Sequence, residues 1–174
     1  MSVYYGEWSH PAWGRWVYIH KDGRIISLKS LDNPHISRNF DKKELPEFEA
    51  SLKRYFSGEF EALRPYQQDA LRELEDSRDF KASVYRELIS TEIGEKTTYS
   101  DIAKKAGAPR ASRAVGQACS QNALLLIIPC HRVVPKNKAL GVGYYAGGSK
   151  LKEKILTYEA RAMAGQEGLE PPTS

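Results

Sequence analysis

A short, uninterrupted apolar run in the second half of the chain constrains the fold most strongly. It covers residues 124–128 (LLLII) and lies between Asn122 and Pro129. The run is far too short to cross a membrane, and its length between turn-forming residues is typical of a segment buried in a globular core. We predict that it is extended and leads directly to Cys130, so that rigid flanking structure fixes the position of this cysteine.

Cys130 is one of only two cysteines in the chain, the other being Cys119. A free cysteine is usually a small buried hydrophobic residue, and we expect this of Cys119. The neighbours of Cys130 indicate a second possibility, because His131 and Arg132 could favour its thiolate, the nucleophilic form. These neighbours alone support a reactive and a structural cysteine about equally. The spacing of the two cysteines is not that of a metal site.

Two short helices joined by a Gly-containing turn are predicted before the apolar run. Thr98 can cap the first helix, with Asp101 at its third position, and Gly107 can end it. The second helix is expected to run to about Gln121. This arrangement is typical of a helix-turn-helix, although helical pairs also occur in many proteins that never bind DNA.

The second of these helices is unusually rich in small residues. They are Ala111, Ser112, Ala114, Gly116, Ala118, Cys119 and Ser120. Small side chains allow close approach to another helix or to a nucleic-acid groove, and their spacing alone favours packing inside the protein. Gly116 lowers helix stability by roughly 1 kcal/mol relative to Ala, so another constraint must explain it. Arg113 stands out as a long, always charged side chain. We expect Val115 and Ala118 to face the core.

The first part of the chain predicts a small α/β unit. Residues 15–20 and 24–28 are rich in aromatic and β-branched residues and flank an Asp-Gly pair, a signal for a hairpin. A helix follows, because apolar residues recur at helical spacing after Pro46. We expect residues 59–79 to contain a polar helix and a connection. The residues expected to pack in or on the core include Trp8, Trp13 and Trp16.

The chain is expected to become mainly helical at Phe80. Phe80, Val84 and Leu88 mark the core face of a helix that we predict to end at Gly94. A last helix is also expected, in which the residues that face inward are Leu151, Ile155 and Tyr158. Together the elements predict an α/β protein of the α+β type.

The predicted organisation is a small sheet-plus-helix domain (residues 1–79), a mainly helical domain with the helix-turn-helix (residues 80–164) and a disordered polar tail (residues 165–174). The start of the chain lacks the profile of a secretory signal, so we expect a cytoplasmic protein, or a nuclear one in a eukaryote. The net charge of +4 is compatible with nucleic-acid binding but does not require it.

Residues 80–159 resemble the catalytic domain of the methylated-DNA–protein-cysteine methyltransferases, also called O6-alkylguanine-DNA alkyltransferases. The matching elements are Thr97-Thr98-Tyr99, Arg113-Ala114-Val115-Gly116, Asn122, Pro129-Cys130-His131-Arg132-Val133-Val134, Gly143-Tyr144-Tyr145 and Glu159. The sequence PCHRVV behind a buried aliphatic run is highly specific, and it agrees in order and spacing with RAVG and the upstream Tyr. The N-terminal unit is only loosely similar to the family's variable N-terminal domain.

The resemblance implies that Cys130 is a nucleophile that takes an alkyl group from the O6 atom of guanine. It also implies that His131, acting through a water and oriented by Glu159, accepts the thiol proton. Tyr99 would donate a hydrogen bond to the departing base. Asn122 would hold the turn between the second helix and the apolar run.

The resemblance further implies binding to the minor groove of double-stranded DNA, with the O6-alkylguanine nucleotide flipped out. Arg113 would occupy the vacated space in the stack. The implied DNA-binding residues are Tyr99, Ser100, Arg110, Ala111, Arg113, Gly116 and Lys136. The implied lining of the base pocket is Tyr99, Val133, Tyr145 and Ala146. Many relatives have Ser at the last of these positions, so a hydroxyl role there is lost while a backbone donor remains.

The reaction is expected to occur once per chain, because a thioether has no good leaving group and nothing in the sequence suggests a second thiol or cofactor that would regenerate Cys130. We expect no cofactor and no metal, since residues 1–79 contain no cluster of Cys and His. A monomer without membrane association is expected. Two alternatives are a module that recognises alkylated bases without repairing them, which would lack the reactive cysteine, and a Cys-His thiol hydrolase, which leaves the RAVG helix unexplained.

Overall fold

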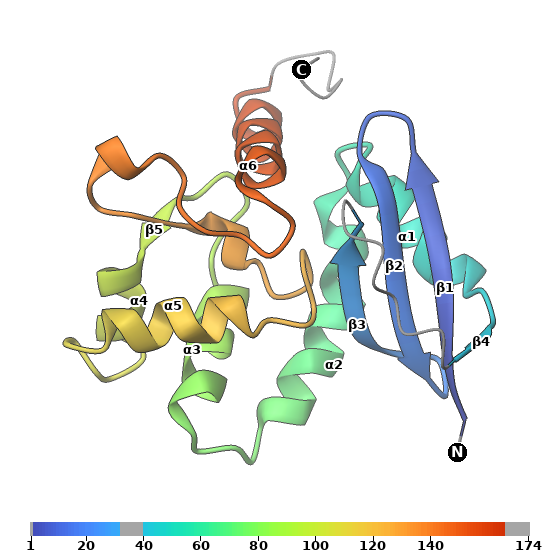
Figure 1. Ribbon diagram of the computed structural model, residues 1–174, viewed down its shortest axis with the longest axis horizontal. Helices are drawn as coiled ribbons and strands as arrows, with labels where there is room; N and C mark the ends of the chain where they lie inside the picture. The colour runs from blue at the N-terminus through green and yellow to red at the C-terminus, as the bar shows by residue number, and fades with distance from the viewer. Residues whose placement is uncertain (1, 32–39, 166–174) are drawn as a thin grey trace.

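The computed structural model describes residues 2–31 and 40–165, with a sheet on one side and a group of helices on the other (Figure 1). The earlier elements are β1 (Val3–His10), β2 (Gly14–Lys21), β3 (Arg24–Ser30), β4 (Asp41–Lys42), α1 (Pro46–Tyr55), the 3₁₀ helix η1 (Phe60–Leu63) and α2 (Arg64–Leu74). The later elements are α3 (Phe80–Ile89), β5 (Thr97–Thr98), α4 (Tyr99–Lys105), α5 (Ser112–Ser120), η2 (Cys130–Arg132), β6 (Val133–Val134), η3 (Lys138–Leu140) and α6 (Ser149–Met163). The predicted α+β class is confirmed.

The larger sheet has the strand order β3-β2-β1-β4, with β4 parallel to β1 and the other pairs antiparallel. The predicted hairpin joins β2 to β3, where Asp22 and Gly23 adopt φ values of 51° and 82° in a two-residue turn. The sequence pattern does not predict β1, because most of its side chains are half-buried instead of alternating. At its centre, a Cβ atom on Gly6 would lie 2.1 Å from the ring of Tyr18, so only glycine fits there.

Helix α1 and the aromatic residues of the hairpin form the core on the sheet side. The helix has Pro46 in its first turn, as its predicted start requires. Phe48 packs edge-on against Tyr18, with ring centroids 5.0 Å apart. Trp13 and Trp16 are 2% and 0% exposed, which confirms their predicted place in the core.

The predicted pair of helices corresponds to α4 and α5, which lie against each other (Figure 1). The Oγ1 atom of Thr98 accepts a hydrogen bond from the backbone nitrogen of Asp101 at 3.2 Å, so the predicted cap of α4 is confirmed. Gly107 follows α4 with a φ of 84°. Val115 and Ala118 on α5 are buried, as predicted.

Helix α3 is shorter than the sequence pattern predicts, because it ends at Ile89 and not at Gly94. Thr91 explains the early end. Its backbone nitrogen and its hydroxyl both donate to the carbonyl oxygen of Leu88, at 3.1 and 2.6 Å, which closes the last turn. Gly94, with a φ of 78°, lies in the connection that leads to β5.

The apolar run is buried, as predicted, but the prediction that it is extended is wrong. Leu126 adopts a φ of 68° in a turn formed by residues 125–127. One residue of β3 satisfies the backbone at the start of this turn. Leu28 donates to the carbonyl oxygen of Ala123 at 2.8 Å and accepts from the nitrogen of Leu125 at 3.1 Å. The run therefore touches the sheet at one point and then turns back toward Cys130.

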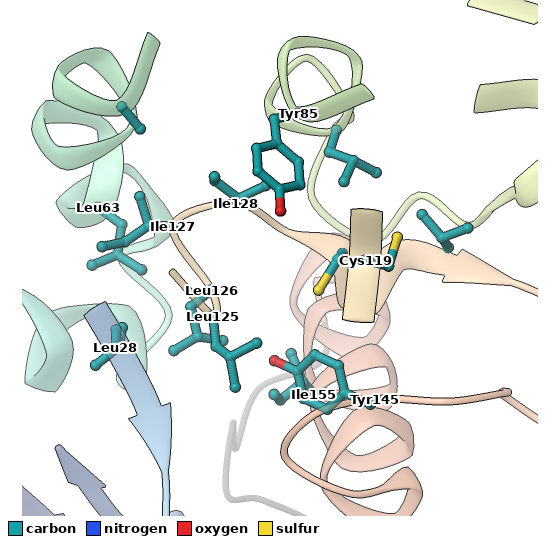
Figure 2. Close-up of a cluster of buried hydrophobic side chains, with 14 of the residues drawn as sticks. Leu28, Leu63, Tyr85, Cys119, Leu125, Leu126, Ile127, Ile128, Tyr145 and Ile155 are labelled. Atoms are coloured by element: carbon teal, nitrogen blue, oxygen red, sulfur yellow. The ribbon is translucent and has the colours of Figure 1, made fainter. Parts of the chain in front are cut away.

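A single cluster of buried side chains connects the sheet with the helices. Figure 2 shows Leu125 and Leu126 between Leu28 of β3 and the pair Tyr145 and Ile155. Within residues 2–31 and 40–165, no helix is both long and apolar enough to span a membrane. The predicted tail of residues 165–174 lies outside the described residues except for Gly165.

Candidate active site

Cys130 is the first residue of η2, directly after the buried turn, and its side chain is 3% exposed. Asn122 fixes this segment through three contacts. Its Nδ2 atom donates to the carbonyl oxygen of Ile128 at 2.8 Å and to Sγ of Cys130 at 3.2 Å. Its Oδ1 atom accepts from the nitrogen of Leu124 at 2.9 Å. One buried amide therefore joins the end of α5, the turn and the sulfur atom.

The environment of Cys130 favours the neutral thiol. Burial raises the pKa of this thiol, while the hydrogen bond from Asn122 and the charge of Lys152 oppose the shift. His131 and Arg132, which could have favoured the thiolate, instead direct their side chains to hydrogen bonds with Glu159. A nucleophilic reaction at Cys130 thus requires that the thiol proton be removed.

Glu159 on α6 is fully buried and is the centre of the polar network behind Cys130. Its Oε1 atom accepts from Nε2 of His131 at 2.9 Å, from the hydroxyl of Tyr55 at 2.8 Å and from Nη2 of Arg132 at 3.0 Å. Its Oε2 atom accepts from Nε of Arg132 at 3.0 Å and from the nitrogen of Gly94 at 3.4 Å. These donors compensate the burial of a carboxylate charge.

The network keeps Glu159 ionised and His131 neutral. Burial opposes ionisation of Glu159, but His131 and Arg132 hold the pKa of the carboxyl well below its usual value. Burial lowers the pKa of His131, although Glu159 opposes that shift. A neutral imidazole that donates from Nε2 to Glu159 has its lone pair on Nδ1. That nitrogen is buried and has no hydrogen-bond partner among the described residues, so it can accept a proton.

Lys152 is a buried cation that the sequence analysis missed. It is 0% exposed, and its Nζ atom donates to the carbonyl oxygens of Val133 at 2.6 Å and Tyr144 at 3.0 Å. These bonds attach α6 to β6 and to the segment that follows it. Its position was detectable, because Lys152 lies three residues before Ile155 and seven before Glu159, on the inward face of the helix.

Tyr99 begins α4 and faces two glycines. A Cβ atom on Gly116 would lie 3.8 Å from its ring, and one on Gly143 would lie 3.4 Å from its hydroxyl oxygen. Burial raises the pKa of Tyr99 to about 12, so its hydroxyl is a hydrogen-bond donor at neutral pH. A Cβ atom on Gly116 would make only an ordinary van der Waals contact with the Tyr99 ring, so this ring does not explain the glycine.

The other residues predicted for the base pocket differ in exposure. Val133 and Tyr145 are buried, and the Tyr145 ring meets His131 edge-on with centroids 6.4 Å apart. The hydroxyl of Tyr145 has no hydrogen-bond partner within the described part of the chain. Ala146 is exposed. The structure thus brings Tyr145 next to the polar network and leaves Ala146 at the surface.

The residues predicted to bind DNA lie on and around the helix pair. Arg110 and Arg113 are exposed at the start of α5, and Lys136 is exposed after β6. Ser100 is half-buried, with its hydroxyl 3.0 Å from that of Thr98, so it takes part in the cap of α4. The remaining two positions, Ala111 and Gly116, are half-buried.

The sequence of the chain is similar to those of known proteins. Residues 79–161 match the family described as 6-O-methylguanine DNA methyltransferase, DNA binding domain. The constitutive methylated-DNA–protein-cysteine methyltransferase of Bacillus subtilis is 36% identical over 154 residues, which cover 84% of this chain and 89% of that protein. The enzyme of that name from Saccharomyces cerevisiae is 48% identical over 81 residues, but these span only 47% of this chain and 42% of the yeast protein.

A solved structure shares the fold along most of its length. The O6-methylguanine methyltransferase of Mycobacterium tuberculosis superposes with a TM-score of 0.73 at 25% identity, covering 92% of this chain and 94% of that one. The agreement includes the sheet as well as the helical part, since the coverage extends far beyond the family match. The chain therefore belongs to the methylated-DNA–protein-cysteine methyltransferase family.

Proposed function

We propose that this protein repairs DNA by transferring the alkyl group of O6-alkylguanine to its own Cys130, once per chain. The observation that carries this proposal is the arrangement around the buried thiol. Asn122 contacts the sulfur of Cys130 at 3.2 Å. The next residue in the chain, His131, is neutral and hydrogen-bonds to the ionised Glu159. The name shared by the relatives, methylated-DNA–protein-cysteine methyltransferase, specifies the same acceptor residue type.

The proposed chemistry begins with the thiol proton. It passes through a water molecule to Nδ1 of His131, and Glu159 stabilises the resulting imidazolium. The sulfur of Cys130 then forms a bond to the O6-alkyl carbon while the bond from that carbon to O6 breaks. The electron pair stays on the guanine, where the hydroxyl of Tyr99 donates a hydrogen bond to the developing negative charge.

The substrate is double-stranded DNA in the proposed reaction. The helix pair approaches the minor groove, the alkylated nucleotide flips out, and Arg113 occupies the space that it leaves. Exposure of Arg113 and the small side chains of α5 support this arrangement. Tyr145 and Val133 would line the base pocket, and Arg110 and Lys136 would contact phosphates.

The single turnover follows from the product. The alkyl group ends in a thioether, which offers no leaving group under mild conditions, and no step of the proposed reaction regenerates the thiol. A thiol hydrolase would instead act many times and would not need DNA.

Intact-mass measurement after incubation with O6-methylguanine DNA tests the proposal. We expect one added methyl group per chain, mapped to the peptide that contains Cys130. Cys130→Ala should abolish the addition, whereas the matched variant Cys119→Ala should retain it. Binding without a mass change would favour a recognition module, and transfer by the Cys130→Ala variant would contradict the assignment.

A further inference from the structure

One hydrogen bond reaches the buried carboxylate from outside the matched family domain. The hydroxyl of Tyr55 donates to Oε1 of Glu159 at 2.8 Å, and Tyr55 is 2% exposed. Tyr55 is the last residue of α1, in the proposed N-terminal domain, 104 positions before Glu159. The network behind Cys130 is therefore completed by a residue from the sheet side of the molecule.

Tyr55 is held firmly in this position. Its ring meets the rings of Phe56 and Phe60 edge-on, with centroids 5.0 and 5.2 Å away. Its carbonyl oxygen accepts a hydrogen bond from the hydroxyl of Tyr158 at 3.0 Å. Both the ring and the backbone of Tyr55 are thus fixed. Packing therefore sets the direction in which its hydroxyl points toward Glu159.

The oxygen that Tyr55 contacts is the one that also contacts the proposed base. Oε1 of Glu159 accepts from Tyr55, His131 and Arg132, whereas Oε2 accepts from Arg132 and Gly94. Each donor to Oε1 withdraws charge from the side of the carboxylate that faces the imidazole. The bond from Tyr55 consequently weakens the attraction of Glu159 for a proton on His131.

We propose that Tyr55 is a positioning residue for alkyl transfer, which fixes Oε1 of Glu159 and limits how strongly that oxygen stabilises protonated His131. This inference rests on the proposed function, because it concerns the proton transfer that precedes attack by Cys130. The phenol serves as a neutral donor, since burial raises the pKa of Tyr55 well above its usual value. The N-terminal domain is thereby part of the catalytic arrangement.

The effect of Tyr55 can be separated from those of the other groups near His131. Besides Glu159 and Tyr55, these are Arg132 of η2, Lys152 of α6, Tyr145 of the preceding segment and the thiol of Cys130. Tyr55→Phe removes one hydroxyl and leaves all of them in place. Oε1 then carries more charge toward His131, so the histidine becomes easier to protonate.

The first test compares two full-length variants in single-turnover reactions. Tyr55→Phe should shift the acidic limb of the pH–rate profile for transfer from O6-benzylguanine base to Cys130 to higher pH, and it should slow transfer only on that limb, where more of His131 is then protonated. The matched control is Tyr18→Phe, which removes a buried hydroxyl that bonds to Glu49 and Leu45 and touches neither Tyr55 nor Glu159. It should lower the melting temperature but keep the pH–rate midpoint of the wild type.

Equal rate losses in the two variants with unchanged midpoints would reduce Tyr55 to a packing residue and overturn the proposal. Double substitution gives an independent criterion. In a Glu159→Gln background, Tyr55→Phe should change the rate little further, because its acceptor carboxylate is gone. Full additivity of the two effects would contradict action through Glu159.

A second variant preserves the ring and the hydroxyl. Replacement of Tyr55 by 3-fluorotyrosine makes the phenol a stronger donor, so the acidic limb should move to lower pH, opposite to the shift in Tyr55→Phe. An unmoved limb would refute the proposal even if Tyr55→Phe does not fold. Wild-type protein that fails to alkylate Cys130 would instead refute the proposed function, so the two failures are distinguishable.

Discussion

Arg132 binds the carboxylate of Glu159 with two nitrogen atoms, Nε to Oε2 and Nη2 to Oε1, both at 3.0 Å. The guanidinium also donates to the carbonyl oxygen of Thr91 at 2.6 Å. A planar fork suits this geometry, and a lysine cannot reproduce it. The residue next to the proposed base therefore acts on the carboxylate and not on the sulfur.

Arg132→Lys should destabilise the protein by about 3 kcal/mol, because it breaks a buried, bidentate ion pair. Urea denaturation measures this loss. The matched control is Arg72→Lys, since Arg72 forms an exposed pair with Asp69 and should change the unfolding free energy by less than about 0.5 kcal/mol. A similar loss of unfolding free energy in both variants would contradict the expectation that burial of the Arg132–Glu159 pair causes the larger effect.

Acidification should lower the unfolding free energy in two stages. The pKa of His131 is lowered by burial from 6.5, and that of Glu159 is lowered by its partners, against burial, from 4.5. In both cases the unfolded chain binds protons more readily, so the stability is present above the unfolded pKa and is lost as pH falls. The unfolding free energy should be measured by urea denaturation from about pH 7.5, roughly one unit above the usual pKa of histidine, down to about pH 4. The loss of stability that belongs to His131 should appear first as the pH falls.

Glu159→Gln provides the matched comparison for the second stage. It removes the carboxylate, so the decline in stability around and below pH 4.5 should become shallower. A pH dependence identical to that of the wild type would show that Glu159 is not the responsible group.

Asn122→Asp should slow alkyl transfer and shift its rate profile to higher pH. The change keeps the acceptor for the nitrogen of Leu124 but replaces the donor to Sγ of Cys130 with a negative charge. A charge at this place raises the pKa of the thiol further. Single-turnover rates with O6-benzylguanine measure the effect, and Asn137→Asp, which caps the exposed η3, is the control. Equal profiles for the two variants would exclude an effect of Asn122 on the thiol.

Arg113→Ala should impair transfer from duplex DNA more than transfer from free O6-benzylguanine. Its side chain is exposed on α5 and forms none of the ion pairs found among the described residues, so its loss leaves the site around Cys130 intact. Rates on the two substrates measure the difference. Losses of the same size on both would place Arg113 in the base pocket instead of the DNA stack.

The sequence predicts those elements that are stabilised by contacts between residues close together in the chain. Asp22-Gly23 predicts the hairpin, and Thr98 with Asp101 predicts the start of α4, because the stabilising contacts lie within a few residues. The turn in which Leu126 adopts a positive φ is instead stabilised by a distant part of the chain. It depends on hydrogen bonds with Leu28, almost a hundred positions earlier, which no pattern in the run itself reveals.

The candidate site was predictable only through resemblance. Sequence alone leaves Cys130 undecided, and it suggests a direct influence of Arg132 on the thiol because the two are near neighbours. The backbone of η2 instead directs Arg132 toward Glu159. The sequence does not reveal the contributions of Tyr55 and Thr91, because their partners are distant in the chain. Tyr55 lies 104 positions from Glu159, and Thr91 lies 41 positions from Arg132.

The five hydrogen bonds to Glu159 also determine when the site can form during folding. Their donors lie 104, 65, 28 and 27 positions earlier in the chain, so the carboxylate on α6 closes contacts of high sequence separation. Such contacts form slowly, because the entropy of a long loop must be lost first. During synthesis from the N-terminus, the segment with Cys130 emerges before α6. The network around Glu159 is therefore completed only when the final helix docks, so the proposed base acquires its partner carboxylate at the end of folding.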